Sequence, residues 1–289
     1  MEIILAQTVV NGLMVGMIYV LMAIGFTMVF GIMRIVNFAH GDFYMVGAFL
    51  FAIFYGSNGA PFILSLILAV LGTAALGLFI ERVVFSRFRG NELNGMIASL
   101  GIALMMENGA LFIWGPSPRS VPPVASGVLS VAGVVFPWSR LVVIIGALIA
   151  VGLLYLLITR TQIGRAMRAV AQDSEIALVQ GIRVEVIFPV AFVLGISLAA
   201  LAGALMAPVL SVSPFIGLAP TLKAFIIVVI GGLGSVPGAV AGGLLIGLIE
   251  SFAGTFVSAS IAEILQFLVV IAVVLLRPQG LLGRKEREA

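Results

Sequence analysis

The feature that most constrains this 289-residue chain is a series of long apolar stretches separated by short polar segments. A helix that crosses a bilayer needs about 20 mostly apolar residues. The candidate stretches are residues 8–32, 43–56, 61–80, 95–115, 141–158, 186–207, 222–250 and 261–276. We therefore predict an all-α, polytopic transmembrane bundle with about eight membrane segments, one of them broken or re-entrant. We expect residues 1–289 to form a single transmembrane domain.

The composition supports a membrane protein. Hydrophobic residues make up 62% of the chain and charged residues only 9%, whereas soluble domains have about 45–50% and about 25%. The chain has no cysteine, and His40 is its only histidine, which excludes disulfides, iron–sulfur clusters and multi-histidine metal sites. The net charge of +3 reflects basic residues between the apolar stretches, so membrane orientation explains it better than a nucleic-acid partner does.

Most basic residues lie in three polar segments: residues 81–94, residues 159–185 and the C-terminal tail. Basic segments beside membrane spans are usually cytoplasmic, so we predict these three inside and residues 116–140 outside. The same rule predicts a periplasmic N-terminus and a cytoplasmic C-terminus. The basic residues of the tail are Arg277, Arg284, Lys285 and Arg287.

This orientation constrains the long seventh stretch. Residues 222–250 must start and finish on the outer side if the tail is inside. They are too few for two full crossings, which need about 40 residues. A re-entrant pair of half-helices, bent at the Gly/Pro-rich residues 231–238, fits the available length. The backbone N–H and C=O groups of a non-helical segment at membrane depth must find hydrogen-bond partners in the protein or in a water-filled cavity. This break therefore indicates a pathway.

No enzyme motif is present. The sequence contains neither a Ser/His/Asp arrangement in a recognisable context nor a His-Glu-x-x-His motif, and it lacks the phosphate-binding pattern Gly-x4-Gly-Lys-Ser/Thr. We predict that the chain is not an enzyme. If it uses ATP, another chain hydrolyses it.

Polar residues and glycines interrupt the apolar sequence over residues 33–45, just before the short second stretch. One interpretation is a loop at the membrane edge in which Asp42 caps the next helix. The other is a broken helix that lines a gate or substrate path, with His40 and Asp42 fixing its geometry. The sequence leaves both open.

Acidic residues also fall within the apolar stretches. Glu107 lies inside the fourth stretch and Glu250 ends the seventh. An acidic group within a span indicates a functional site by default, but a structural hydrogen bond to another helix explains it equally well, and we favour that for Glu250. Lys223 and Glu263 lie near predicted span ends, where we expect them to act as interfacial anchors.

The polar residues 161–182 have apolar positions at helical spacing. Asp173 is placed to cap a second short helix that Gly181 ends. Two short helices between spans can be a plain surface loop. They also have the size and amphipathicity to dock a soluble partner.

Four segments of the chain resemble the LivH-type permeases, the membrane subunits of branched-chain amino acid ABC importers. The resemblance runs in order along essentially the whole chain, from Gly31-Ile32-Met33-Arg34-Ile35-Val36-Asn37-Phe38-Ala39-His40-Gly41-Asp42 through Gly164-Arg165-Ala166 and Gly231-Gly232-Leu233-Gly234-Ser235-Val236-Pro237-Gly238 to Arg277-Pro278-Gln279-Gly280-Leu281. One departure concerns the Glu-Ala-Ala-x3-Gly motif of many ABC permeases. Residues 175–181 keep its spacing, but isoleucine replaces the middle-position alanine.

The resemblance implies an ATP-driven importer of the bacterial inner membrane. A periplasmic binding protein would deliver Leu, Ile or Val, and this chain would form the pathway with a LivM-like second permease or with a copy of itself. Two ABC ATPase subunits would bind ATP and Mg and grip a coupling loop at about residues 159–185, while this chain would hold no cofactor. Urea and short amides are alternative substrates. The remaining partner is membrane lipid.

The resemblance also assigns candidate residues. Those implied in ATPase docking are Gly164, Arg165, Arg168, Asp173, Glu175 and Gly181. Those assigned to the pathway or gate are Asn37, His40, Gly41, Asp42, Glu107, Gly231, Gly232, Gly234 and Pro237. The rival of another class is a stand-alone, proton-coupled secondary transporter that relays protons through Asp42, Glu107 or Glu250. Such a transporter would not require a docking loop.

Overall fold

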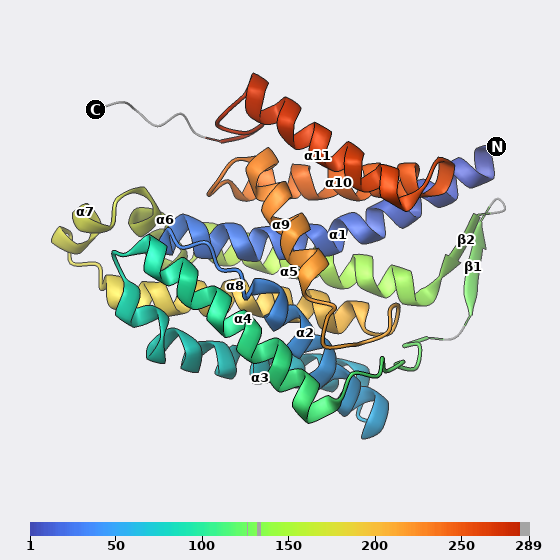
Figure 1. The fold of residues 1–289 in the computed structure, drawn as a ribbon, viewed down its shortest axis with the longest axis horizontal. Coiled ribbons are helices and arrows are strands. Elements are labelled where there is room, and N and C mark those ends of the chain that lie inside the picture. Colours follow the sequence, from blue (N-terminus) through green and yellow to red (C-terminus); the bar gives the residue numbers. More distant parts are fainter. Residues whose placement is uncertain (126, 132–133, 284–289) are drawn as a thin grey trace.

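The computed structural model describes residues 1–125, 127–131 and 134–283. They form a helical bundle with one short β-hairpin (Figure 1), which confirms the predicted all-α membrane fold. Seven of the described helices are long and apolar enough to cross a membrane. They are α1 (Glu2–Met33), α3 (Phe62–Val83), α4 (Glu92–Trp114), α5 (Trp138–Arg160), α8 (Val184–Met206), α10 (Val236–Phe256) and α11 (Ala259–Leu276).

Shorter elements complete the described part of the chain. They are α2 (His40–Phe51), its π-helical extension η1 (Ala52–Ser57), the 3₁₀ turn η2 (Phe85–Phe88), α6 (Gln162–Gln172), α7 (Ser174–Val179), α9 (Leu218–Gly231), and the antiparallel strands β1 (Val128–Val131) and β2 (Val134–Pro137). The hairpin and the N-terminus lie at one end of the bundle, and α6 and α7 lie at the other (Figure 1). We call these the hairpin end and the α7 end.

Helix α1 is the central element of the bundle. Most of its length is buried, whereas most of α11 faces outward. Helices α1 and α10 run antiparallel at very short range, because glycines face each other where they cross: a Cβ atom on Gly247 would lie 2.3 Å from the Cα of Gly16. Small residues permit this close approach in membrane bundles, where tight packing replaces the hydrophobic effect as a source of stability.

The bundle contains two units of the same layout in opposite orientation. In each, a long helix (α1 or α8) is followed by a non-helical segment, a helix that begins inside the bundle (α2 or α9) and a hairpin of two longer helices (α3–α4 or α10–α11). Each unit packs on the central helix of the other: α2 and α3 contact α8, while α9 and α10 contact α1. This is an inverted repeat, an architecture that many transporters share.

Reciprocal glycine contacts lie where the two units meet. A Cβ atom on Gly25 would lie 2.4 Å from the carbonyl oxygen of Gly195, and one on Gly195 would lie 2.6 Å from that of Gly25. Gly41 and Gly217 make the same mutual contact, at 2.0 and 2.4 Å. The backbones of α1 and α8, and the starts of α2 and α9, therefore touch directly.

The structure corrects the predicted seventh membrane segment. Helix α9 has only 14 residues, but α10 has 21 and is long enough to cross the membrane alone, so the two are not a pair of half-helices. The break between them lies at the α7 end, not at mid-depth (Figure 1). There, Leu281 and Leu282 of the tail donate backbone hydrogen bonds to Ile230 and Gly231. The missing crossing length comes from residues 207–217, whereas the predicted orientation places residues 208–221, after the sixth stretch, on the outer side.

A buried ion pair stabilises the α7 end of the α3–α4 hairpin. Glu81 of α3 is fully buried and its carboxylate lies 2.6 Å from the guanidinium of Arg89. The same guanidinium stacks over the ring of Phe188 on α8, 5.5 Å from its centroid. Arg277 is the last basic residue of the tail that the structure describes; Arg284, Lys285 and Arg287 lie outside the described residues.

Candidate functional site

The segment that joins α1 to α2 folds back into the bundle. Arg34 closes α1 in a left-handed conformation with φ of 55°. The backbone N–H of Phe38 donates to Ser99 Oγ of α4 at 3.0 Å, and that of Ala39 donates to Asn37 Oδ1 at 3.1 Å. Protein side chains thus accept hydrogen bonds from the backbone N–H groups of this segment, as a non-helical segment at membrane depth requires. The geometry is that of a broken helix rather than of a loop at the membrane edge.

His40 fixes the start of α2 inside the bundle. Its imidazole is fully buried, and Nε2 donates to the carbonyl oxygen of Met22, in the middle of α1, at 3.1 Å. Its ring also meets Phe26 edge-on, with centroids 5.5 Å apart. His40 therefore ties α2 to α1.

Asp42 does not cap α2, contrary to one of our interpretations. Ala39 occupies the N-cap position, and no side chain forms a capping hydrogen bond there. Asp42 is nearly buried on α2, and Glu107 lies on α4, which packs against α2. Two predicted pathway residues thus lie on helices that contact each other.

Gly41 marks the place where α2 meets α9. It packs directly on Gly217, which precedes α9, and on Thr221, whose hydroxyl donates to the carbonyl oxygen of Gly217 at 2.8 Å. Gly217 and Thr221 were not predicted from the sequence. The signal that could have found them is Pro220, because proline is tolerated in the first turn of a helix and so marks a helix start.

The other predicted pathway residues lie elsewhere. Gly232 and Gly234 have positive φ angles of 103° and 80° in the turn between α9 and α10, at the α7 end. Ser235 caps α10 by accepting a hydrogen bond from the N–H of Gly238 at 3.1 Å, and Pro237 lies in the first turn. Gly231 packs against Gly238 across this turn. The predicted pathway set is therefore split between the middle of the bundle and its α7 end.

The predicted docking segment forms two short helices, as expected. Asp173 caps α7: its Oδ1 accepts hydrogen bonds from the N–H groups of Glu175 and Ile176, both at 2.9 Å. Gly181 ends the turn after α7 with φ of 82°. Gly164 lies in tight contact with the last turn of α5, where a Cβ atom would be 2.3 Å from the carbonyl oxygen of Leu157.

The outward face of α6 and α7 combines charged and apolar side chains. Arg165, Arg168, Asp173 and Glu175 are exposed, although the guanidinium of Arg168 also donates to the carbonyl oxygen of Ile158. On α7, three large apolar side chains are exposed as well: Ile176, Leu178 and Val179. An exposed apolar patch with charged residues beside it is typical of a protein–protein contact.

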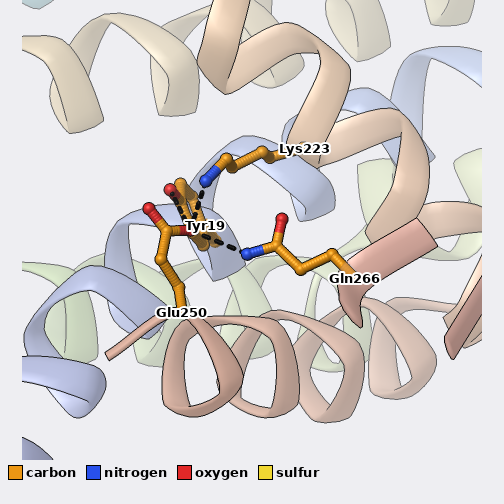
Figure 2. Close-up of polar contacts among 4 residues, drawn as sticks. All are labelled: Tyr19, Lys223, Glu250 and Gln266. Carbon is orange, nitrogen blue, oxygen red and sulfur yellow. Dashed lines mark hydrogen bonds and ion pairs between the residues drawn. The ribbon is translucent and has the colours of Figure 1, made fainter. Parts of the chain in front are cut away.

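One polar cluster was not foreseen. Lys223 of α9 forms an ion pair with Glu250 of α10 inside the bundle (Figure 2), so it is not the interfacial anchor we expected. Glu250 does accept hydrogen bonds from other helices, as predicted: Tyr19 of α1 donates at 2.9 Å and Gln266 of α11 at 3.1 Å. The pairing required the packing of four helices, which no local pattern reveals.

Known proteins are similar in sequence to this chain over almost its full length. Residues 8–274 match the family described as branched-chain amino acid transport system / permease component. The chain is 35% identical to the high-affinity branched-chain amino acid transport system permease protein BraD of Pseudomonas aeruginosa, over 98% of this chain and 97% of the relative. It is 32% identical to the corresponding protein LivH of Escherichia coli, over 98% and 96% of the two chains.

A more distant relative comes from an archaeon. It is the probable branched-chain amino acid transport permease protein LivH of Methanocaldococcus jannaschii, which is 26% identical over 91% of this chain and 88% of its own length. No solved structure matches the chain. With several helices suited to crossing a membrane and a family match over most of its residues, the chain belongs to the permease components of branched-chain amino acid transport systems.

Proposed function

We propose that this chain is an inner-membrane permease subunit of an ATP-driven ABC importer for the branched-chain amino acids Leu, Ile and Val. The observation that carries the proposal is the similarity to BraD and LivH over nearly the whole chain. In this proposal a periplasmic binding protein delivers the substrate, and a second, LivM-like permease completes the pathway. ATP and Mg²⁺ are bound by two ATPase subunits, and this chain performs no bond chemistry.

The helix pair α6–α7 is the proposed ATPase-docking site. Its caps at Thr161 and Asp173 fix the two helices, and its outward face presents charged and apolar side chains together. Arg165, Arg168 and Glu175 would contact the ATPase, while Gly164 and Gly181 would set the shape of the loop. This assignment makes the α7 end cytoplasmic and the hairpin end periplasmic, with the N-terminus outside and the C-terminus inside.

We assign the two groups of pathway residues to different depths. Asn37, His40, Gly41, Asp42 and Glu107 would line or support the middle of the pathway. Gly231, Gly232, Gly234 and Pro237 would form its gate at the α7 end, close to the docked ATPases. ATP-driven closure of the ATPases would favour one arrangement of the two inverted units over the other, which is a shift between existing states.

A second candidate is a stand-alone, proton-coupled transporter. The acidic residues Asp42 and Glu107 on the contacting helices α2 and α4 favour it, because acidic residues inside a bundle form the proton relays of such proteins. The helix pair α6–α7 argues against it, since a self-sufficient transporter has no need of a docking surface. Urea and short amides remain alternative substrates within the importer proposal.

Purification from native membranes tests the proposal. Affinity capture of this chain in mild detergent should bring down two ATPase subunits and a second permease in stoichiometric amounts. Proteoliposomes with the complex should then take up leucine only with ATP inside and the binding protein outside. A chain that purifies alone and transports without ATP would support the proton-coupled alternative instead.

A further inference from the structure

Four helices contribute to a single polar cluster in the apolar part of the bundle (Figure 2). Tyr19 of α1, Lys223 of α9 and Gln266 of α11 all donate to the same oxygen, Oε2 of Glu250 on α10. The Lys223 ammonium also lies over the ring of Tyr19, 5.3 Å from its centroid. The cluster is thus a carboxylate and an ammonium held in a fixed relative position.

Packing alone does not explain this ion pair. Ionised groups inside a membrane bundle are expensive, and apolar residues of similar volume often replace a buried ion pair at no loss of stability. Residues elsewhere in the same helices are overwhelmingly apolar. A charged pair at this position therefore indicates a function that apolar residues could not perform.

The cluster is closed on one side and open on the other. Tyr19 and Gln266 are buried, with 8% and 2% of their surface exposed, whereas the side chains of Lys223 and Glu250 are 14% and 31% exposed. The second carboxylate oxygen of Glu250 accepts no hydrogen bond from any described residue. The cluster therefore offers a free acceptor on a partly exposed carboxylate.

The ammonium has spare capacity as well. A lysine side chain carries three N–H donors, and within the described residues Lys223 uses one of them, on Glu250. Lys223 also lies in the N-terminal half of α9, a helix that begins inside the bundle.

We propose that Lys223 and Glu250 bind the charged head group of an α-amino acid during its passage through the permease. The substrate ammonium would contact the free oxygen of Glu250, and the substrate carboxylate would contact Lys223. A neutral ion pair matches a zwitterion, which has both charges and no net charge, better than it matches urea or an amide. The inference rests on the proposed importer function and names the residues that contact its cargo.

Variants of the pair test this in the assembled complex, reconstituted with its partner subunits and binding protein. Lys223→Met/Glu250→Gln removes both charges and keeps the side-chain lengths. Glu263→Gln is the matched control, because Glu263 is an exposed acidic residue on the neighbouring helix α11. We measure assembly, ATP hydrolysis without substrate and leucine uptake.

We expect the neutral double variant to assemble and to hydrolyse ATP like the wild type, while its uptake falls about tenfold or more, which corresponds to about 1.4 kcal/mol of lost substrate contact. The control should transport normally. Wild-type uptake by the neutral double variant would overturn the inference. If the wild-type complex itself fails to transport, the importer proposal fails instead, so the two failures are distinguishable.

The swapped variant Lys223→Glu/Glu250→Lys covers the case in which the neutral variant does not assemble. It restores an ion pair but reverses the positions of its charges. If the pair binds a zwitterion, the swapped protein assembles but does not transport, because the substrate meets like charges. Restored uptake, or failure of both variants to assemble, would show that the pair is structural and would refute the inference.

Discussion

Replacing Gly41 by alanine should separate the two helices that begin inside the bundle. The added Cβ atom would lie 2.0 Å from the carbonyl oxygen of Gly217 and 2.0 Å from the hydroxyl oxygen of Thr221. The hydroxyl can rotate, but the backbone oxygen cannot move without shifting α9. Overpacking of a tight core typically costs about 1–3 kcal/mol, occasionally more. We expect the upper end, about 3 kcal/mol, because the obstruction is backbone.

This loss of stability is large enough to measure. In a chain of this size, about 1 kcal/mol shifts the melting temperature by about 2–4 °C, so Gly41→Ala should lower it by about 6–12 °C. The matched control is Gly152→Ala on α5, where a Cβ atom meets no heavy atom within 4 Å. There, alanine should be neutral or stabilising by up to about 1 kcal/mol, because it restricts the unfolded chain.

The assay is the monodisperse fraction of purified protein in mild detergent after heating, separated by size-exclusion chromatography. Gly217→Ala provides a second test of the same contact from the other helix, since its Cβ atom would lie 2.4 Å from the carbonyl oxygen of Gly41. Equal melting temperatures for Gly41→Ala and Gly152→Ala would refute the proposed direct contact between the starts of α2 and α9.

Three further predictions use other parts of the bundle. Charge reversal of Arg165 and Arg168 should abolish uptake while the protein remains folded in the membrane, and normal uptake would rule out docking at α6–α7. Cysteines at Ser130 and Gln180 should react with an impermeant maleimide from outside and inside respectively, without background labelling because the chain has no native cysteine; the opposite result would invert the proposed orientation. Glu81→Gln should destabilise the α3–α4 hairpin by about 1–3 kcal/mol, measured by melting, because it leaves a partly buried guanidinium without its counter-charge; an unchanged melting temperature would contradict that.

Local chemistry explains what could be predicted from the sequence. Long apolar stretches indicated the membrane helices because span length is set by the bilayer. The cap at Asp173 and the helix end at Gly181 were predictable because both effects are local. The side-chain oxygen of Asp173 accepts from N–H groups two and three residues later, and Gly181 only needs to adopt a positive φ.

Contacts between distant segments explain what could not be predicted. Helix α2 starts at His40 because the imidazole bonds to the middle of α1, 18 residues earlier in the chain. The ion pair of Lys223 and Glu250 joins residues 27 positions apart, which only the packing of α9 on α10 brings together. Residues 208–221 were expected on the outer side because they follow the sixth span, yet their turns enter the bundle and let Gly217 reach Gly41.

The inverted repeat shows which polar residues the fold itself requires. Gly41 and Gly217 make the same mutual contact, so the two starts can be aligned on them. In this alignment the residue after each glycine is Asp42 in one unit and Leu218 in the other. Lys223, six positions beyond Gly217, corresponds to Gly47, which packs on the backbone of α8. The same helix start therefore forms with a charged residue at each of these two positions in one unit and with an uncharged residue in the other. Neither charge is needed to start a helix inside the bundle, which agrees with the functional roles that we propose for Asp42 and Lys223.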